Sequence, residues 1–250
     1  MDKEHEINNV LIFDVWGSYA HFRRFYTTTS PLTFSVPPRT ALCGLIGAII
    51  GLEKENNEYL KYFTLNKASI GLRLLNPVKK MMIAENLIHT KNAKGPGMNL
   101  ITERTQIGFE FLKDQKYRIY FHHTDENIYH ELKENLEKHK SFYTPCLGLS
   151  ENIANFKFMG EFKVQSKSDE KYAKINSVLP IEKVKDVNFK RDGEYFSMRV
   201  PIEMNVDRVV TKYSDILFER NCKPLEVNLT GSYWMVMQDG CSKENFVFIE

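Results

Sequence analysis

The residues FSVPPRTALCGLIGAIIGL, from Phe34 to Leu52, join a proline-restricted loop to a short apolar segment. Pro37 and Pro38 fix φ and keep the residues before them extended, so a helix can begin no earlier than Arg39. Thr40 is then the predicted N-cap. The apolar residues recur at the spacing of one helix face: Leu42, Leu45, Ile46 and Ile49. This stripe predicts a helix that packs against the rest of the chain.

The start of this helix is a candidate anion site. A helix N-terminus presents unpaired N–H groups and a partial positive charge, and Arg39 would add a guanidinium beside them. A phosphate or a carboxylate would fit these donors. The alternative is an ordinary buried helix with a solvated arginine at its first turn.

Length and composition are those of a soluble globular chain that can bury a sizeable core. The 250 residues are 42% hydrophobic and 26% charged, and 34 basic against 32 acidic residues leave a net charge of +2. A nucleic-acid site must therefore be a local patch. The four cysteines are widely spaced without a CxxC pair, and no apolar run is long enough to span a bilayer. We expect reduced thiols in a cytoplasmic protein that binds no membrane.

A basic and aromatic segment follows the first predicted strand, Val10 to Trp16, whose apolar sequence indicates burial on both faces. This segment, Gly17 to Ser35, holds four residues suited to nucleic acid: Arg23, Arg24, Phe25 and Tyr26. Guanidinium groups pair with phosphates, and rings stack on unpaired bases. The pattern indicates a site for single-stranded nucleic acid. The alternative is a surface loop whose rings turn inward.

A second basic segment is TKNAKGPGMNL, from Thr90 to Leu100, which is too polar and too rich in glycine for a core. We interpret it as a flexible finger that carries Lys91 and Lys94. The alternative is a surface loop without a role.

The predicted elements follow one another as strand, helix, strand, strand, helix, strand. Asp125 is the predicted N-cap of the second helix, Glu126 to Lys140. The later strands are Ala68 to Asn76, Met81 to Ile88, a hairpin of Ile107 to Leu112 and Tyr117 to Phe121 that turns at Lys113 to Lys116, and Phe156 to Val164 with a kink at Gly160. This order predicts an α+β fold of the ferredoxin-like βαββαβ type.

A polar linker, Gln165 to Lys174, separates two parts of different composition. We expect residues 1–165 to form the ferredoxin-like domain and residues 166–250 to form a small, mostly β extension. Its predicted strands are 195–200, 206–213, 225–229, 233–237 and 246–249.

Two adjacent histidines, His122 and His123, follow the strand that ends at Phe121, and Asp125 and Glu126 come soon after. A histidine at a strand end can act as a general base, or as a metal ligand together with carboxylates. A solvated turn fits better, because HHxDE matches no common ligand spacing. The common catalytic motifs are absent, and we expect neither a metal nor a cofactor.

Three blocks of sequence together resemble one known family: WGSYAHFRRF, PPRTALCGLIGAIIGL and TPCLGLSENIANF. On these blocks the chain is similar, from Asn9 to Val164, to the Cas-five family of CRISPR-associated RAMP proteins, and most similar to its type I-B branch. The resemblance implies a non-catalytic subunit of the Cascade antiviral surveillance complex that caps the 5′ handle of CRISPR RNA (crRNA). Its implied partners are the handle, the backbone and large subunits of Cascade and, indirectly, target DNA.

Carried onto this chain, the resemblance implies a ferredoxin-like palm and a thumb-like hairpin from about Ile88 to Arg104. The RNA-binding residues would be Arg23, Arg24, Phe25, Tyr26, Arg39 and Thr40 on the palm, with Lys91, Lys94 and Arg104 on the thumb. One branch of the family instead cleaves repeat RNA without a metal, with catalytic residues around the start of the second helix. That helix opens here with Glu126, Asn127 and Ile128, which do not match. A metal-independent endoribonuclease that uses His122 and His123 is the alternative.

Overall fold

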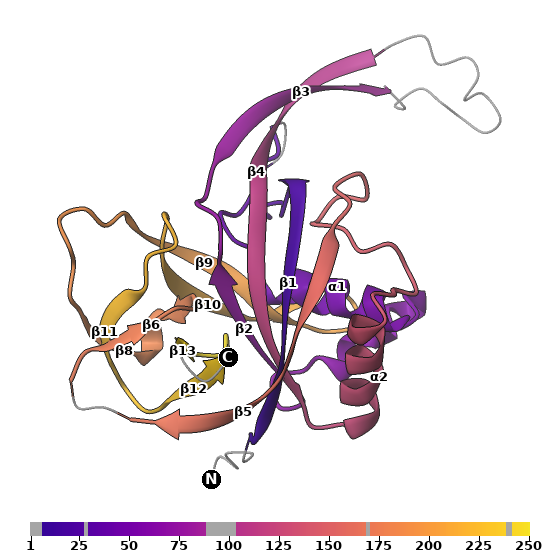
Figure 1. Cartoon of the computed structure of the whole chain (residues 1–250). Helices are drawn as coiled ribbons and strands as arrows, with labels where there is room; N and C mark the ends of the chain where they lie inside the picture. The colour runs from indigo at the N-terminus through magenta and orange to yellow at the C-terminus, as the bar shows by residue number, and fades with distance from the viewer. Residues whose placement is uncertain (1–6, 28–29, 89–103, 169–170, 239–241) are drawn as a thin grey trace.

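The computed structural model describes residues 7–27, 30–88, 104–168, 171–238 and 242–250. Its α-helices are α1 (Arg39–Ile50) and α2 (Glu126–Glu137), and 3-10 segments include Glu55–Tyr62 and Ile181–Lys183 (Figure 1). The strands are β1 (Asn9–Ala20), β2 (Ala68–Leu74), β3 (Lys80–Ile88), β4 (Arg104–His123), β5 (Asn155–Lys167), β6 (Ala173–Ile175), β7 (Leu179–Pro180), β8 (Val184–Val187), β9 (Tyr195–Met204), β10 (Val210–Glu219), β11 (Leu225–Leu229), β12 (Tyr233–Gln238) and β13 (Ser242–Phe246). Within these described ranges, no helix has both the length and the apolar character needed to cross a membrane.

A seven-stranded sheet forms the centre of the molecule, in the order β13-β12-β5-β1-β4-β2, and β3 pairs with the outer part of β4. All of these pairings are antiparallel. Successive side chains of β1 enter different apolar clusters, because strand side chains alternate between faces. Leu11 and Phe13 join the cluster that contains both helices, whereas Val10 and Ile12 join the cluster around Phe246. The predicted strand that is buried on both faces is therefore confirmed.

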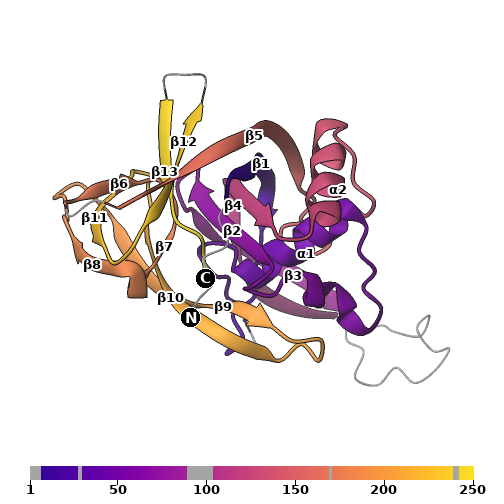
Figure 2. The same ribbon diagram turned by 90° about the horizontal axis from the view of Figure 1, so that it is seen from below.

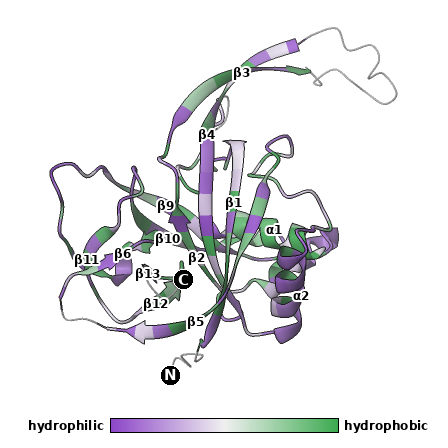
Figure 3. Cartoon of the chain, in the orientation of Figure 1, coloured by the Kyte–Doolittle hydropathy of each residue, from purple (hydrophilic) through white to green (hydrophobic). Residues whose placement is uncertain are grey.

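Both predicted helices are present, and their ends follow local rules. Helix α1 begins at Arg39, but its N-cap is Pro38 and no side chain caps it, so the prediction that Thr40 is the N-cap is wrong. The reason is that proline already has an extended conformation that suits the position before a helix. Asp125 caps α2 as predicted, since its carboxylate accepts a hydrogen bond from the Asn127 N–H at 2.9 Å. Figure 3 shows that α1 is mostly hydrophobic and α2 largely hydrophilic.

The hairpin that was predicted between residues 107 and 121 is wrong. Strand β4 runs without interruption from Arg104 to His123, and the predicted turn residues pair with the end of β1, as in Tyr19 opposite Lys113. Asp114 takes a φ of 51° within the strand, and so absorbs the turn-like sequence without reversing the chain. The outer part of β4 pairs with β3 in a two-stranded ribbon that projects beyond the sheet (Figure 1).

The described residues beyond 170 are mainly strands, and some of their buried side chains join the core of the first part of the chain while others form a cluster of their own. Strands β12 and β13 extend the central sheet next to β5, as Figure 2 shows. Strands β9 and β10 form a second sheet with β7, and Ile202 of β9 is buried in one cluster with α1. The strand predicted at 206–213 lies at Val210–Glu219 instead, because residues 205–209 form the turn between β9 and β10. The domain boundary at residue 165 stays a prediction.

A buried ionic network also ties the end of the chain to the central sheet. Arg118 of β4 donates to the carboxylates of Asp14 and Glu244 at 2.8 and 2.7 Å. Glu244 of β13 further accepts hydrogen bonds from Arg73 and, at 2.7 Å, from the Tyr120 hydroxyl. Burial, together with the Glu244 charge, raises the pKa of Tyr120 well above its usual value. This hydroxyl therefore remains a donor, and the network connects β1, β2 and β4 with β13.

Candidate nucleic-acid interface

The basic and aromatic loop after β1 is held by backbone hydrogen bonds between its two arms. The Phe34 N–H donates to the Phe22 carbonyl at 2.8 Å, and the Arg24 N–H donates to the Leu32 carbonyl at 2.9 Å. The rings of Phe22 and Phe34 are buried in the main core. Phe25 and Tyr26, which follow the first arm, are therefore attached to a well-anchored segment of the chain.

The rings of Phe25 and Tyr26 are exposed, and they line a cleft of about 710 Å³. Phe25 and Tyr26 are 65% and 58% exposed, so the alternative with rings turned inward holds for Phe22 but not for them. Strand β9 also lines the cleft, with Phe196 among its lining residues. Phe25 also reaches β10, where its ring centroid lies 5.7 Å from that of Tyr213. The cleft thus joins the loop after β1 to strands from the other end of the chain.

Cationic side chains from four segments line this cleft: Arg24, Lys80, Arg199 and Arg220. Two of them have carboxylate partners, since Lys80 lies 3.0 Å from Glu110 and Arg220 lies 3.0 Å from Glu194. Burial lowers the pKa of Lys80, and the hydrogen bond that Lys80 donates to Glu110 opposes this shift. Neutralised pairs of this kind position the walls of the cleft more than they attract a ligand.

Arg24 and Arg199 form no ion pair with any residue in the described ranges. Arg24 donates to the Tyr26 hydroxyl at 2.7 Å and to the Thr33 carbonyl at 3.0 Å. Arg199 lies over the ring of Tyr213, with its Cζ 5.3 Å from the ring centroid. Both guanidinium groups are therefore without an ion-pair partner among the described residues, and they line the cleft from two different segments. A chain of phosphates with unpaired bases matches this arrangement, since guanidinium groups bind phosphates and exposed rings stack on bases.

Arg39 is not part of this cleft, and its predicted role at an anion site is wrong. Its side chain is 1% exposed. The guanidinium donates to the carbonyls of Phe63 at 2.9 Å and Ile202 at 3.0 Å, and also to those of Thr64 and Ala68. The alternative of a solvated arginine is wrong as well. The guanidinium stabilises the core, because its hydrogen bonds connect α1 with the segment around the start of β2 and with β9.

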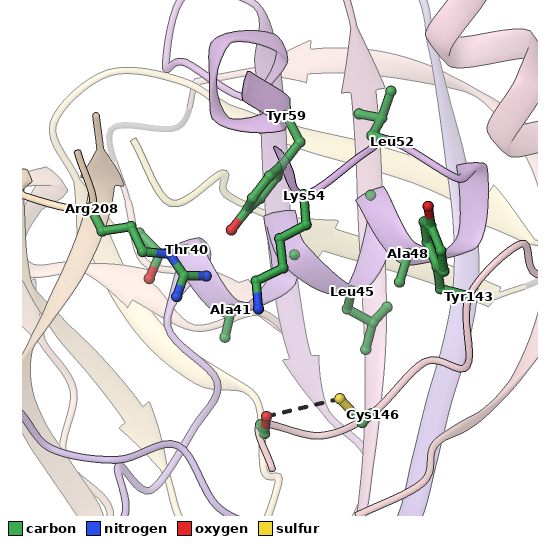
Figure 4. Close-up of a pocket in the computed structure, with 13 residues that line it drawn as sticks. Thr40, Ala41, Leu45, Ala48, Leu52, Lys54, Tyr59, Tyr143, Cys146 and Arg208 are labelled. Atoms are coloured by element: carbon green, nitrogen blue, oxygen red, sulfur yellow. Dashed lines mark hydrogen bonds between the residues drawn. The ribbon is translucent and has the colours of Figure 1, made fainter. Parts of the chain in front are cut away.

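The other predicted residues lie in different places. Thr40 lines a separate groove along α1 (Figure 4). Arg23 is exposed beside the cleft and donates to the Thr27 carbonyl at 3.1 Å. Arg104 pairs with Ile88 at the outer end of the ribbon, on the predicted thumb. Lys91 and Lys94 lie outside the described residues. Of the predicted set, Arg24, Phe25 and Tyr26 therefore converge on the cleft.

The two candidate catalytic histidines have structural contacts. His123 is buried; its Nδ1 accepts the Asp125 N–H at 2.9 Å, which leaves Nε2 to donate to the Tyr62 carbonyl at 2.7 Å. Nδ1 of His122 lies 3.1 Å from the Asn9 carbonyl. His123 thus secures the junction between β4 and α2. The described residues include no group of three or more His, Cys, Asp or Glu side chains that could hold a metal ion.

We expect His123 to make folding stability depend on pH. Burial lowers its pKa from the usual 6.5, so the unfolded chain binds a proton that the folded protein excludes. The contribution is complete above about pH 6.5 and is lost as the pH falls below it. His123→Gln should reduce the slope of unfolding free energy against pH by up to about 1.4 kcal/mol per pH unit, the value for one proton. Urea unfolding between pH 5 and 7 measures this slope. The exposed His130→Gln is the control, and an unchanged slope in His123→Gln would contradict the prediction.

Sequence reasoning missed the second wall of the cleft. It treated Tyr195 to Val200 only as a strand, although YFSMRV mixes aromatic and basic residues as the first loop does. Phe196 is 45% exposed there, and Arg199 lies nearby on the same strand. An exposed phenylalanine beside an arginine was the available signal. Its proximity to the first loop depends on tertiary structure, because the two segments are far apart in sequence.

The geometry defines a mixed α/β protein, built mostly from antiparallel sheets, with an open basic and aromatic cleft. Among solved structures it is similar to the crystal structure of a CRISPR protein from Archaeoglobus fulgidus, with a TM-score of 0.52 and 15% identity over 96% of this chain and 98% of that chain. The fold is therefore shared with a CRISPR protein.

The amino-acid sequence matches the family described as CRISPR-associated protein (Cas5) over residues 10–171. The chain therefore belongs to the Cas5 family, which confirms the family that the sequence motifs indicated. A comparison with curated proteins finds no match.

Two chains from larger assemblies resemble it less closely. One is from a CRISPR RNA-guided surveillance complex, with a TM-score of 0.47 and 10% identity over 88% of this chain and 91% of that chain. The other is from a Type III-B Cmr-beta complex bound to cognate target RNA and AMPPnP, with a TM-score of 0.49 and 11% identity over 87% of this chain and 86% of that chain. Because both TM-scores lie below 0.5, neither of these two similarities is used as support for the fold.

Proposed function

We propose that this chain is a non-catalytic subunit of a CRISPR surveillance complex that binds the 5′ handle of crRNA as a single strand in the cleft. The observation that carries the proposal is that Arg24 and Arg199, which have no ion-pair partner in the described ranges, line one cleft together with exposed aromatic rings. Phosphates would bind these cations, and splayed handle bases would stack on Phe25, Tyr26 or Phe196. Membership in the Cas5 family supports the same role.

We also propose that β1, α1, β2, β4, α2 and β5 form a ferredoxin-like unit with the β3–β4 ribbon as its thumb. The support is the strand order β5-β1-β4-β2, in which each helix follows the first strand of a βαβ half. The thumb would contact a neighbouring backbone subunit. Assignment to type I-B remains a prediction from the sequence motifs.

The test measures binding of fluorescein-labelled single-stranded RNA that carries the cognate handle sequence. The double variant Arg24→Glu and Arg199→Glu should bind about 100-fold more weakly, because two charge-assisted interactions become repulsive. Its plot of log affinity against log salt should be shallower by about 0.7 for each phosphate that the variant no longer neutralises. Fluorescence anisotropy at several salt concentrations gives both quantities.

The matched control is the double variant Lys174→Glu and Lys185→Glu, which reverses two exposed charges in the separate β6-β11-β8 sheet. It should bind the RNA nearly as well as the unchanged protein. Equal weakening in both double variants would mean that net charge alone drives binding, and unaltered binding by Arg24→Glu and Arg199→Glu would exclude the cleft.

The rival is a metal-independent endoribonuclease at His122 and His123. The contacts of the buried His123 ring with Asp125 and Tyr62 support a structural role instead. Incubating the pure protein with cognate repeat RNA in EDTA separates the two functions. We expect no defined cleavage product. A defined cut that disappears in His122→Ala would establish the enzyme.

A further inference from the structure

A groove of about 520 Å³ runs along the surface of α1, apart from the cleft described above. Its floor consists of small or aliphatic residues of α1 and the residues just after it: Ala41, Gly44, Leu45, Ala48 and Leu52. Tyr143 borders the far end, and Tyr59 borders the end near Thr40 (Figure 4). The floor therefore offers an apolar surface without side-chain hydrogen-bond donors.

The rim at the far end extends this apolar surface. Phe142 and Tyr143 are 72% and 45% exposed, which is unusual for aromatic side chains. Their backbone N–H groups donate to the carbonyls of Ile49 at 3.1 Å and Ala48 at 2.9 Å. The two rings are thus held against the C-terminal half of α1. A preformed apolar patch of this kind is typical of a protein–protein contact.

The opposite end of the groove is cationic. Lys54 and Arg208 extend their side chains toward Thr40 from two separate segments (Figure 4). Both side chains are exposed, and neither has a hydrogen bond or an ion pair with a residue in the described ranges. The groove therefore combines an apolar floor with two cationic side chains at one end.

We propose that this groove docks a segment of another protein subunit that carries two bulky apolar side chains and, next to them, a carboxylate. The apolar side chains would cover α1, and the carboxylate would pair with Lys54 and Arg208. A nucleic acid fits less well, because the five apolar floor residues offer its phosphates neither a cation nor a side-chain donor. The cations at one end would fix the direction of the bound segment. This inference stands apart from RNA binding in the cleft.

Gly44 provides a selective way to block the groove. Gly44 lines the groove and a Cβ at this position would meet nothing within 4 Å, so we expect a larger side chain here to occupy the groove. Gly44→Trp should fill the groove, whereas Gly44→Ala should leave the groove open. Alanine also favours the helix, so the control should be at least as stable as the unchanged protein.

The experiment replaces Tyr143 with the photo-crosslinker p-benzoyl-phenylalanine in the full chain, co-expressed with the proteins encoded beside it. Irradiation and mass spectrometry should identify a peptide of another subunit with two bulky apolar residues near an Asp, a Glu or a C-terminal carboxylate. Gly44→Trp should reduce this crosslink at least about tenfold, because the buried centre of a contact carries most of its affinity. Lys54→Glu with Arg208→Asn should reduce it about fivefold, as expected for exposed ion pairs. Asparagine suits position 208, where φ is 60°.

Gly44→Ala and the cleft variant Arg24→Glu with Arg199→Glu should both leave the crosslink unchanged. Loss of RNA binding in the cleft can therefore be distinguished from loss of protein docking in the groove. Circular dichroism melts verify that every variant is folded. A crosslink to RNA, a crosslink to a second copy of this chain, no crosslink at all, or a protein crosslink that resists Gly44→Trp would each overturn the proposal.

Discussion

Arg39→Met should lower the free energy of unfolding by about 3–5 kcal/mol, because several buried carbonyls would lose their donor at about 1–3 kcal/mol each. The guanidinium is the hydrogen-bond donor that these carbonyls share, and two of them, Phe63 and Ile202, belong to segments far apart in the chain. Methionine fills similar space but donates nothing. Urea unfolding monitored by circular dichroism measures the destabilisation.

The same variant separates a structural arginine from an RNA-binding one. Handle RNA should bind to the folded fraction of Arg39→Met with unchanged affinity, since the guanidinium does not reach the surface. Arg23→Met is the matched control, because Arg23 is exposed beside the cleft and should lose little stability. A fully stable Arg39→Met protein with weakened RNA binding would contradict the buried role.

Glu244→Ala should also cost about 3–5 kcal/mol of stability, the usual effect of removing one partner from a buried ion pair. The Glu244 carboxylate is 2.7 Å from both Arg118 and the Tyr120 hydroxyl, and its removal would leave these groups buried with fewer partners. Arg118 would retain Asp14. Thermal unfolding measures the effect.

Two further variants define the origin of that destabilisation. Glu244→Gln keeps the size and an acceptor oxygen, so it should cost less than Glu244→Ala. Lys243→Ala removes the neighbouring exposed side chain of β13 and should change stability by no more than about 0.5 kcal/mol. If Glu244→Ala and Lys243→Ala were equally mild, the network would not hold β13 to the central sheet.

Local patterns in the sequence predicted much of the first part of the fold. Pro37 and Pro38 placed the start of α1, Asp125 placed the start of α2, and the apolar run of β1 predicted burial on both faces. These features depend on neighbouring residues, through fixed φ angles, a capping carboxylate and side-chain periodicity. The motifs of the same region also predicted the Cas5 family, which the family match confirms.

The failures come from interactions between distant segments. KDQK after Leu112 has the composition of a turn, but three of its four residues pair with β1, and the residues before and after it pair with β3 and β2. The energy of this strand pairing outweighs local turn preference, as long-range structure commonly does. The mostly β extension beyond residue 165 stays a prediction, and its strand β9 contributes to the core around α1.

For the candidate site, the sequence by itself determined that Arg24, Phe25 and Tyr26 lie together on one loop of a Cas5 protein, since adjacent residues remain adjacent in any fold. Only the tertiary structure decided that Arg199 and Phe196 line the same cleft as these residues. It also decided that Arg39 points inward, because its acceptor carbonyls come from four residues spread between Phe63 and Ile202. An arginine is exposed or buried according to whether the folded chain brings enough acceptors to it, and no local pattern records that.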